Sequence, residues 1–264
     1  MLFERICQSL TARSQNYTIR HFSHSKFGRK LAQFRNVHSG KRCFLIGNGP
    51  SLRASDLDVL HRAGEITFAF NRIFNIFDQT EWRPTYYVSQ DEKMLEGCID
   101  IVNQQNLGTK FIPIQMNWYF NLPVKNAVYF NLTHQGFENP CDSKFGDDFT
   151  DKIYNSSTCM YTAAQIAAYM GFTEIYMIGV DHHFQISKNN KGEIVVDNTV
   201  KDYFSDQYNA DKDKLYIPNT EKSTLTYIAM KHHCEQRNIK VYNATRGGKL
   251  EVFSRKEFDS LFLI

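Results

Sequence analysis

The sequence predicts an α/β fold of the Rossmann-like type, with a mostly parallel sheet, helices on both faces and an inserted lid segment. Short β-rich runs alternate with longer amphipathic stretches, which is typical of βαβ units. A helical pattern followed by a short turn and a strand occurs twice, at residues 158–178 and 223–242. The expected strands are residues 42–46, 66–70, 85–88, 110–114, 127–130, 174–178 and 240–242.

The amino-acid composition is that of an ordinary globular protein. The 264 residues are 42% hydrophobic, enough for one large α/β domain or two small ones with a real core. No run of about 18 apolar residues predicts a membrane span, and residues 1–20 lack the apolar centre of a secretory signal. Six dispersed cysteines without a C-x-x-C pair indicate reduced thiols in a cytoplasm and give no reason to expect zinc.

Charge is concentrated at the start of the chain. Residues 1–42 carry nine Lys or Arg against Glu4, which is +8, so the stated net charge of +3 leaves −5 for the remainder. We therefore expect a basic extension at residues 1–40 before a nucleotide-sugar-binding domain at residues 41–264. Such an arm suits an anionic membrane surface, nucleic acid, a transit peptide or a plain solvated helix. The body has no basic stripe, which disfavours nucleic acid and leaves peripheral membrane contact as the sharper expectation.

The first expected strand ends abruptly in a glycine-rich turn. Gly47 and Gly49 permit unusual backbone angles and close approach, while Pro50 suits the first turn of a helix. With Asn48 between the glycines and the Ser51 hydroxyl after them, the turn predicts either a phosphate cradle or a bend without a ligand. It matches neither G-x-G-x-x-G nor a Walker loop.

Polar residues also follow the next two strands. Asn71 and Arg72 come after the second, and Gln90 and Asp91 after the third. Parallel pairing would bring them to the sheet edge that holds the glycine turn. An amide, a guanidinium and a carboxylate there suit a nucleotide, although each is also an ordinary residue for the end of a strand.

The strand at residues 174–178 runs into Gly179, Val180, Asp181, His182 and His183. This ending suits a general base, a metal site or a capped turn. In an extended chain the adjacent side chains of His182 and His183 point to opposite faces, which disfavours binding of one metal ion by both. A histidine is the more attractive acid or base because its ordinary pKa is about 6.5. The polar stretch that follows, about residues 182–216, is expected to be a long loop or lid.

These pieces resemble known families. Residues 44–52, 70–72, 174–181 and 215–217 are similar to bacterial sialyltransferases that cap lipooligosaccharides. With residues 83–88 and 243–250 added, the chain more closely resembles hydroxymethylpterin-diphosphokinase-like domains of bacterial surface-polysaccharide loci, which are related to flagellin glycosyltransferases. The resemblance covers about residues 40–255 and is specific to the superfamily rather than to one reaction.

The resemblance implies roles for particular residues. The glycine turn and Asn71 would bind a CMP-activated sugar without a catalytic metal, with Asp181 beside the nucleotide. Ser156, Ser157 and Thr158 would face the donor, and Gly179 in its strand-Gly-Val-Asp motif would also contribute to donor binding. Tyr216 would donate a hydrogen bond to the departing phosphate.

Two positions depart from the sialyltransferase pattern. His183 stands where that family has a second phosphate-binding tyrosine, and Asn219 where it has the histidine that deprotonates the acceptor. An amide is no base. Either His183 or His182 has taken over proton transfer, or the reaction differs.

The expected activity is therefore transfer of a sialic-acid-like sugar from a CMP-linked donor to a cell-surface glycan such as lipopolysaccharide or capsule. The enzyme would need no further cofactor and no metal, and would work in the cytoplasm or on the inner face of the membrane, as a monomer or an oligomer. One rival is a diphosphokinase that uses ATP and Mg²⁺ with Asp91 or Asp181 as ligand. A second is a non-catalytic nucleotide-binding protein.

Overall fold

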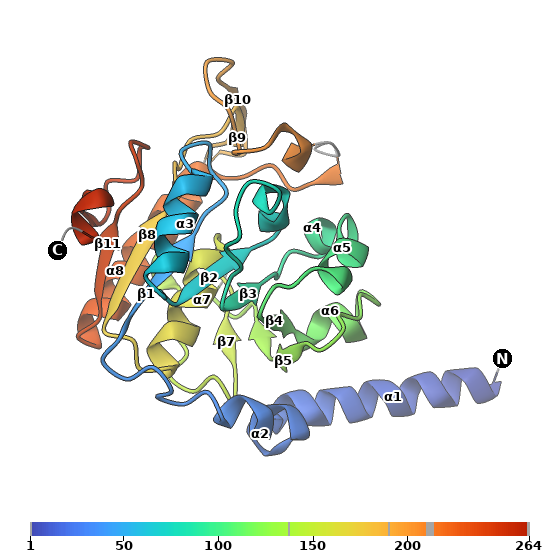
Figure 1. Cartoon of the computed structure of the whole chain (residues 1–264). Helices are drawn as coiled ribbons and strands as arrows, with labels where there is room; N and C mark the ends of the chain where they lie inside the picture. Colours follow the sequence, from blue (N-terminus) through green and yellow to red (C-terminus); the bar gives the residue numbers. More distant parts are fainter. Residues whose placement is uncertain (1, 137, 190, 210–213, 263–264) are drawn as a thin grey trace.

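The computed structural model describes residues 2–136, 138–189, 191–209 and 214–262, and its centre is an eight-stranded sheet (Figure 1). The strand order is β12-β11-β8-β1-β2-β3-β4-β5, and every neighbouring pair is parallel, which confirms the predicted fold class. The strands are β1 (Arg42–Ile46), β2 (Thr67–Phe70), β3 (Tyr86–Val88), β4 (Thr109–Pro113), β5 (Val128–Phe130), β8 (Glu174–Ile178), β11 (Lys240–Asn243) and β12 (Ser254–Arg255).

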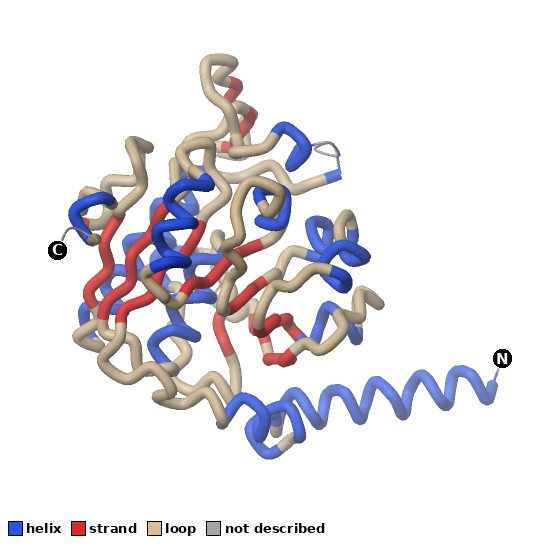
Figure 2. The backbone as a smooth tube through the Cα atoms, viewed as in Figure 1, coloured by secondary structure: helices blue, strands red, loops and turns tan. Residues whose placement is uncertain are grey.

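Helices lie around this sheet, except for the first, which extends away from it (Figure 2). They are α1 (Leu2–Arg20), α2 (Lys26–Ala32), α3 (Ala54–Arg62), α4 (Glu92–Glu96), α5 (Ile99–Gln104), α6 (Ile114–Trp118), α7 (Cys159–Tyr169) and α8 (Thr220–Gln236). The 3₁₀ turns are η1 (Phe22–His24), η2 (Ile73–Ile76), η3 (Pro140–Asp142), η4 (Asp206–Asn209) and η6 (Asp259–Leu261). Two small sheets complete the fold: β6 (Leu132–Thr133) with β7 (Ile153–Tyr154), and the hairpin β9 (Ile186–Lys188) with β10 (Ile194–Val196).

Both faces of the sheet are buried, which explains why its strands read as continuous apolar runs. In β1, Cys43 and Leu45 belong to the core that contains residues of α7 and α8. Phe44 and Ile46 point the other way, into the core formed with α3. This alternation with both faces covered is typical of a doubly wound parallel sheet.

The N-terminal extension has two parts. Helix α1 projects away from the body, and most of its described side chains are exposed (Figure 1). The chain after it packs into the domain: Phe22 and Leu31 are fully buried, and the Phe34 ring lies 5.1 Å from that of Phe111. No helix among the described residues is both long and apolar enough to cross a membrane.

The segments that follow β1 and β8 lie in close backbone contact. Gly47 N donates to Ile178 O at 2.7 Å, and Gly49 N donates to Gly179 O at 2.8 Å. A Cβ atom on Gly47 would lie only 2.2 Å from Gly179 O, so no larger residue fits. The chain leaves β1 towards β2 on one side, whereas β8 lies on the other. The point between them is the switch point at which open α/β sheets bind ligands.

We expect Gly47→Ala to destabilise the protein by about 3 kcal/mol, because its Cβ would collide with a backbone oxygen that cannot move alone. Urea unfolding followed by far-ultraviolet circular dichroism measures this loss. The matched control is Gly64→Ala: Gly64 has φ +64° but no atom within 4 Å of an added Cβ, so it should lose only about 1 kcal/mol. Equal losses in the two variants would contradict the steric explanation.

Candidate nucleotide-binding site

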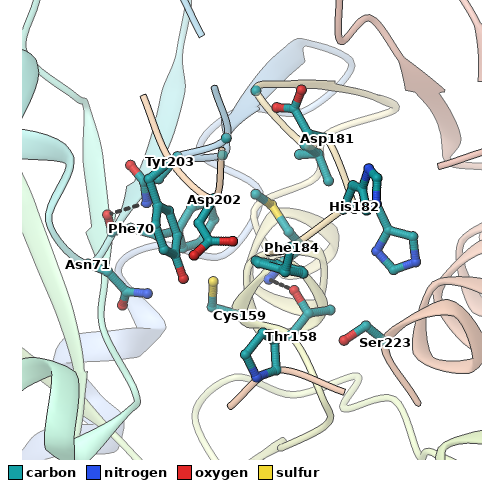
Figure 3. A pocket seen from close by; sticks show the side chains of 18 of the residues that line it. Phe70, Asn71, Thr158, Cys159, Asp181, His182, Phe184, Asp202, Tyr203 and Ser223 are labelled. Atoms are coloured by element: carbon teal, nitrogen blue, oxygen red, sulfur yellow. Dashed lines mark hydrogen bonds between the residues drawn. The ribbon is translucent and has the colours of Figure 1, made fainter. Parts of the chain in front are cut away.

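A cavity of about 190 Å³ lies at this switch point. Its wall is formed by the turn after β1, the end of β2, the first turn of α7 and parts of the segment after β8. Figure 3 shows Tyr203 and Asn71 on one side of the cavity and His182 and Ser223 on the other. Of the residues predicted from sequence, the cavity brings together Gly47, Asn48, Gly49, Asn71, Ser157, Thr158, Gly179, Asp181 and His183.

The Ser51 end of the glycine turn is already occupied by a carboxylate. Asp181 Oδ2 accepts a hydrogen bond from Ser51 Oγ at 2.7 Å and one from Ser51 N at 3.2 Å. Burial raises the pKa of the Asp181 carboxyl above its ordinary value, and the two bonds from Ser51 oppose that shift. Pro50 and Ser51 lie behind the cavity lining, and α3 begins only at Ala54. The N–H and hydroxyl groups of Ser51 therefore donate to the carboxylate of Asp181 and are not directed at a ligand.

The first turn of α7 is the better place for an anion. Ser157, Thr158 and Cys159 line the cavity, and Thr158 caps the helix by accepting from Met160 N at 3.4 Å. The positive end of the helix dipole is thus directed at the cavity. Burial raises the pKa of the Cys159 thiol to about 12, so this sulfur is uncharged at neutral pH and does not repel an anion.

An aromatic pair closes the cavity over the glycine turn. The rings of Tyr203 and Tyr208 stack with centroids 3.9 Å apart. Asn48 Nδ2 donates to Phe70 O at 3.1 Å and to Tyr208 Oη at 3.3 Å, and the buried Arg72 donates to Tyr208 O at 2.6 Å. Asn48 and Arg72 therefore fasten the lid segment to the ends of β1 and β2.

The two histidines after β8 have different surroundings. Nε2 of His182 lies 2.7 Å from Thr224 Oγ1, and burial lowers the pKa of His182 to about 4, so its ring is neutral at physiological pH. Nε2 of His183 lies 3.0 Å from Asp197 Oδ2, at the end of the β9–β10 hairpin. Asp197 is itself fixed by its backbone, whose N–H donates to Gln185 O at 2.8 Å.

Two residues predicted at the third strand end serve local structure. Gln90 Nε2 donates to Asn155 Oδ1 at 2.8 Å. Asp91 caps α4 by accepting from Met94 N at 3.0 Å, and burial raises the pKa of this carboxyl. Neither residue lines the cavity.

The other two predicted catalytic residues also lie outside the cavity lining. Tyr216 is 56% exposed and donates to the carboxylate of Glu92, which raises the pKa of Tyr216 to about 12. Asn219 caps α8: its Oδ1 accepts from Lys222 N at 2.9 Å, and its Nδ2 donates to Asn189 O at 3.0 Å.

Several residues of the cavity lining were not predicted from the sequence as site residues. They are Phe70, Cys159, Met160, Val180, Phe184, Asp202, Tyr203, Tyr208, Pro218, Ser223 and Tyr227. The lid was recognised only by its polarity, and the signal within it was its aromatic residues, which include Phe184, Tyr203 and Tyr208. Across the described residues, no group of three or more His, Cys, Asp or Glu side chains is arranged to hold a metal ion.

A doubly wound parallel sheet with a cavity at its switch point defines a Rossmann-like α/β domain. The family model described as 6-hydroxymethylpterin diphosphokinase MptE-like matches residues 16–187. The chain therefore belongs to the MptE-like family, which confirms the resemblance drawn from its motifs. The match begins within α1, so it includes the buried residues Phe22 and Leu31 of the N-terminal extension.

Two solved structures align with the chain at low sequence identity. The MAf glycosyltransferase from Magnetospirillum magneticum AMB-1 aligns with a TM-score of 0.52 and 15% identity, over 92% of this chain and 39% of that chain. A mammalian sialyltransferase in complex with Gal-beta-1-3GalNAc-ortho-nitrophenol aligns with a TM-score of 0.31 and 10% identity, over 90% of this chain and 86% of that chain. No curated protein matched the sequence.

Proposed function

We propose that this protein is a glycosyltransferase that takes a sialic-acid-like sugar from a CMP-activated donor and passes it to a cell-surface glycan. The observation that carries the proposal is the cavity at the switch point, where the glycine turn, Asn71 and the first turn of α7 meet. Small residues leave room for the donor beside the backbone, and the helix end favours its phosphate.

Asn71 suits the donor because its backbone is fixed. It adopts φ +50°, a conformation that asparagine tolerates better than most residues. Tyr87 Oη donates to Asn71 O at 2.8 Å, and Ser89 Oγ lies 3.4 Å from Asn71 Oδ1. The side-chain amide is thereby held at the cavity wall, where we assign it to the nucleotide (Figure 3).

His183 is the proposed general base. A carboxylate only accepts hydrogen bonds, so Asp197 favours the tautomer of His183 with the proton on Nε2 and leaves Nδ1 as the acceptor. Nδ1 would take the proton of an acceptor hydroxyl as its oxygen bonds to the anomeric carbon of the donor. The bond from that carbon to the phosphate oxygen breaks, and CMP leaves with the electron pair.

Tyr216 and Asn219 take different parts in this proposal. Tyr216 would donate to the departing phosphate once the exposed segment that carries it releases Glu92 and turns towards the cavity. Asn219 would support catalysis only indirectly, as the cap of α8.

The family description favours a second candidate, a diphosphokinase that transfers diphosphate from ATP. It would use Mg²⁺, with Asp181 in the cavity as the carboxylate ligand. Asp91, the other candidate ligand, is the cap of α4.

A thermal-shift panel separates the two activities. Saturating CMP should raise the melting temperature by about 5 °C without a metal, whereas CDP, UDP, GDP, ATP and S-adenosylmethionine should raise it less. The panel is repeated with Mg²⁺ and with EDTA. A larger shift with ATP and Mg²⁺ than with CMP would overturn the glycosyltransferase proposal in favour of the diphosphokinase.

We expect His183→Ala to slow sugar transfer by about 10²-fold while leaving the CMP thermal shift unchanged, since the base acts only in the chemical step. Transfer is measured as release of CMP in the presence of acceptor. The control is His61→Ala, an exposed histidine on α3 outside the cavity, which should retain wild-type turnover. Transfer by His183→Ala within about threefold of wild type, with donor hydrolysis intact, would show that another group is the base.

We also propose that the enzyme rests on an anionic membrane through α1. Leu10 and Tyr17 are 58% and 67% exposed. Arg13 lies three positions after Leu10, and Arg20 lies three positions after Tyr17, so all four side chains are on the same side of the helix. Trp118 at the end of α6 lines a groove with Leu10. Exposed apolar and cationic side chains on one helix suit the interface of anionic lipid.

The double variant Arg13→Glu/Arg20→Glu should bind phosphatidylserine vesicles more than about 30-fold more weakly than wild type, because loss of each cation removes about 1 kcal/mol and each new carboxylate adds repulsion. Co-sedimentation measures the bound fraction, and phosphatidylcholine vesicles give the background. Lys240→Glu/Lys256→Glu reverses two charges at the other end of the chain and should bind like wild type. Equal binding by both double variants would contradict a role for α1.

A further inference from the structure

A second hollow lies beside the donor cavity. It is a groove of about 360 Å³ between α8 and residues 249–252, which follow β11. His182 lines both the groove and the donor cavity. The two hollows therefore share one wall.

Helix α8 forms the partition between them. Ser223 and Tyr227, one helical turn apart, line the donor cavity. Thr224, Ile228 and Lys231 form the neighbouring stripe of the same helix and line the groove. One helix thus presents adjacent stripes to the two hollows.

The wall between the hollows is well fixed. The His182 ring is held by Thr224 on the groove side and packs edge-on against Tyr227 on the cavity side, with centroids 5.5 Å apart at 82°. Lys249 N donates to Asp181 O at 2.8 Å, which ties the loop after β11 to the end of β8. Gly248 permits this contact, since it has φ +73° and a Cβ there would lie 3.0 Å from Asp181 Cα.

The charge of the groove is positive. Lys231 and Lys249 both line it, and neither forms an ion pair with another described residue. Glu251 also lines the groove, but Arg255 binds its carboxylate at 2.7 Å and lowers the pKa of Glu251. Ile228, which is 51% exposed, adds apolar surface for the face of a sugar ring.

We propose that this groove is the acceptor subsite and that it binds a glycan carrying a carboxylate or phosphate close to the sugar that is extended. The inference rests on the proposed function, because it places the acceptor next to the donor cavity. Lys231 and Lys249 hold the anionic group, which places the sugar that is extended beside His182, the residue common to both hollows. A neutral glycan would leave both cations without a partner.

The test compares anionic with neutral sugars. The probes are 3′-sialyllactose against lactose and mannose 6-phosphate against mannose, each titrated calorimetrically into the full chain with CMP present. At least one anionic probe should bind about tenfold more tightly than its neutral partner, and Lys231→Glu/Lys249→Glu should abolish that preference. Lys240→Glu, at the opposite end of β11, should keep it.

The CMP thermal shift is measured on every variant as a check of folding and of the donor site. No preference for an anionic sugar in the wild type, or a preference that survives the double lysine variant, overturns the groove proposal. If CMP still shifts the melting temperature in that case, the donor proposal stands and only the groove is wrong. A sugar preference without any CMP shift would support the groove as an anionic-glycan site and refute the CMP donor.

Discussion

The contact between the carboxyl ends of β1 and β8 is the constraint on which the site depends. Gly47 and Gly179 approach so closely that no side chain fits between them. Asp181 then reaches Ser51 and holds the turn that leads to α3. The same contact sets where the segment after β8 begins, and with it the positions of both histidines. The cavity lies beside this contact and is lined by residues of both segments.

Much of the sheet was predictable because its strands are buried on both faces. The expected strands all occur, with ends that differ by one residue in several cases: the predicted strand 110–114 is Thr109–Pro113, and 127–130 is Val128–Phe130. The helix expected to begin at residue 223 begins instead at Thr220, because Asn219 caps it. Capping by an amide is a local interaction that apolar periodicity does not reveal.

The site was less predictable, because it depends on residues far apart in the chain. The glycines and Ser51 suggest a phosphate cradle, yet a carboxylate 130 positions later takes the donors of Ser51. Only the pairing of β1 with β8 brings the two together. The aromatic character of Tyr203 and Tyr208 is visible in the sequence, but their stacking over the cavity is not, because the stretch that carries them has no periodicity.

The asparagine at position 219 links these observations. By resemblance this position would carry the catalytic histidine, and an amide there is unsuited to proton transfer. As the cap of α8, however, Asn219 fixes the start of the helix whose first turns line both hollows. Because a helix rotates 100° per residue, the start also fixes which side chains meet each hollow. In the proposed mechanism proton transfer belongs to His183, on the segment held by Asp197, and Asn219 serves to order the wall between the cavity and the groove.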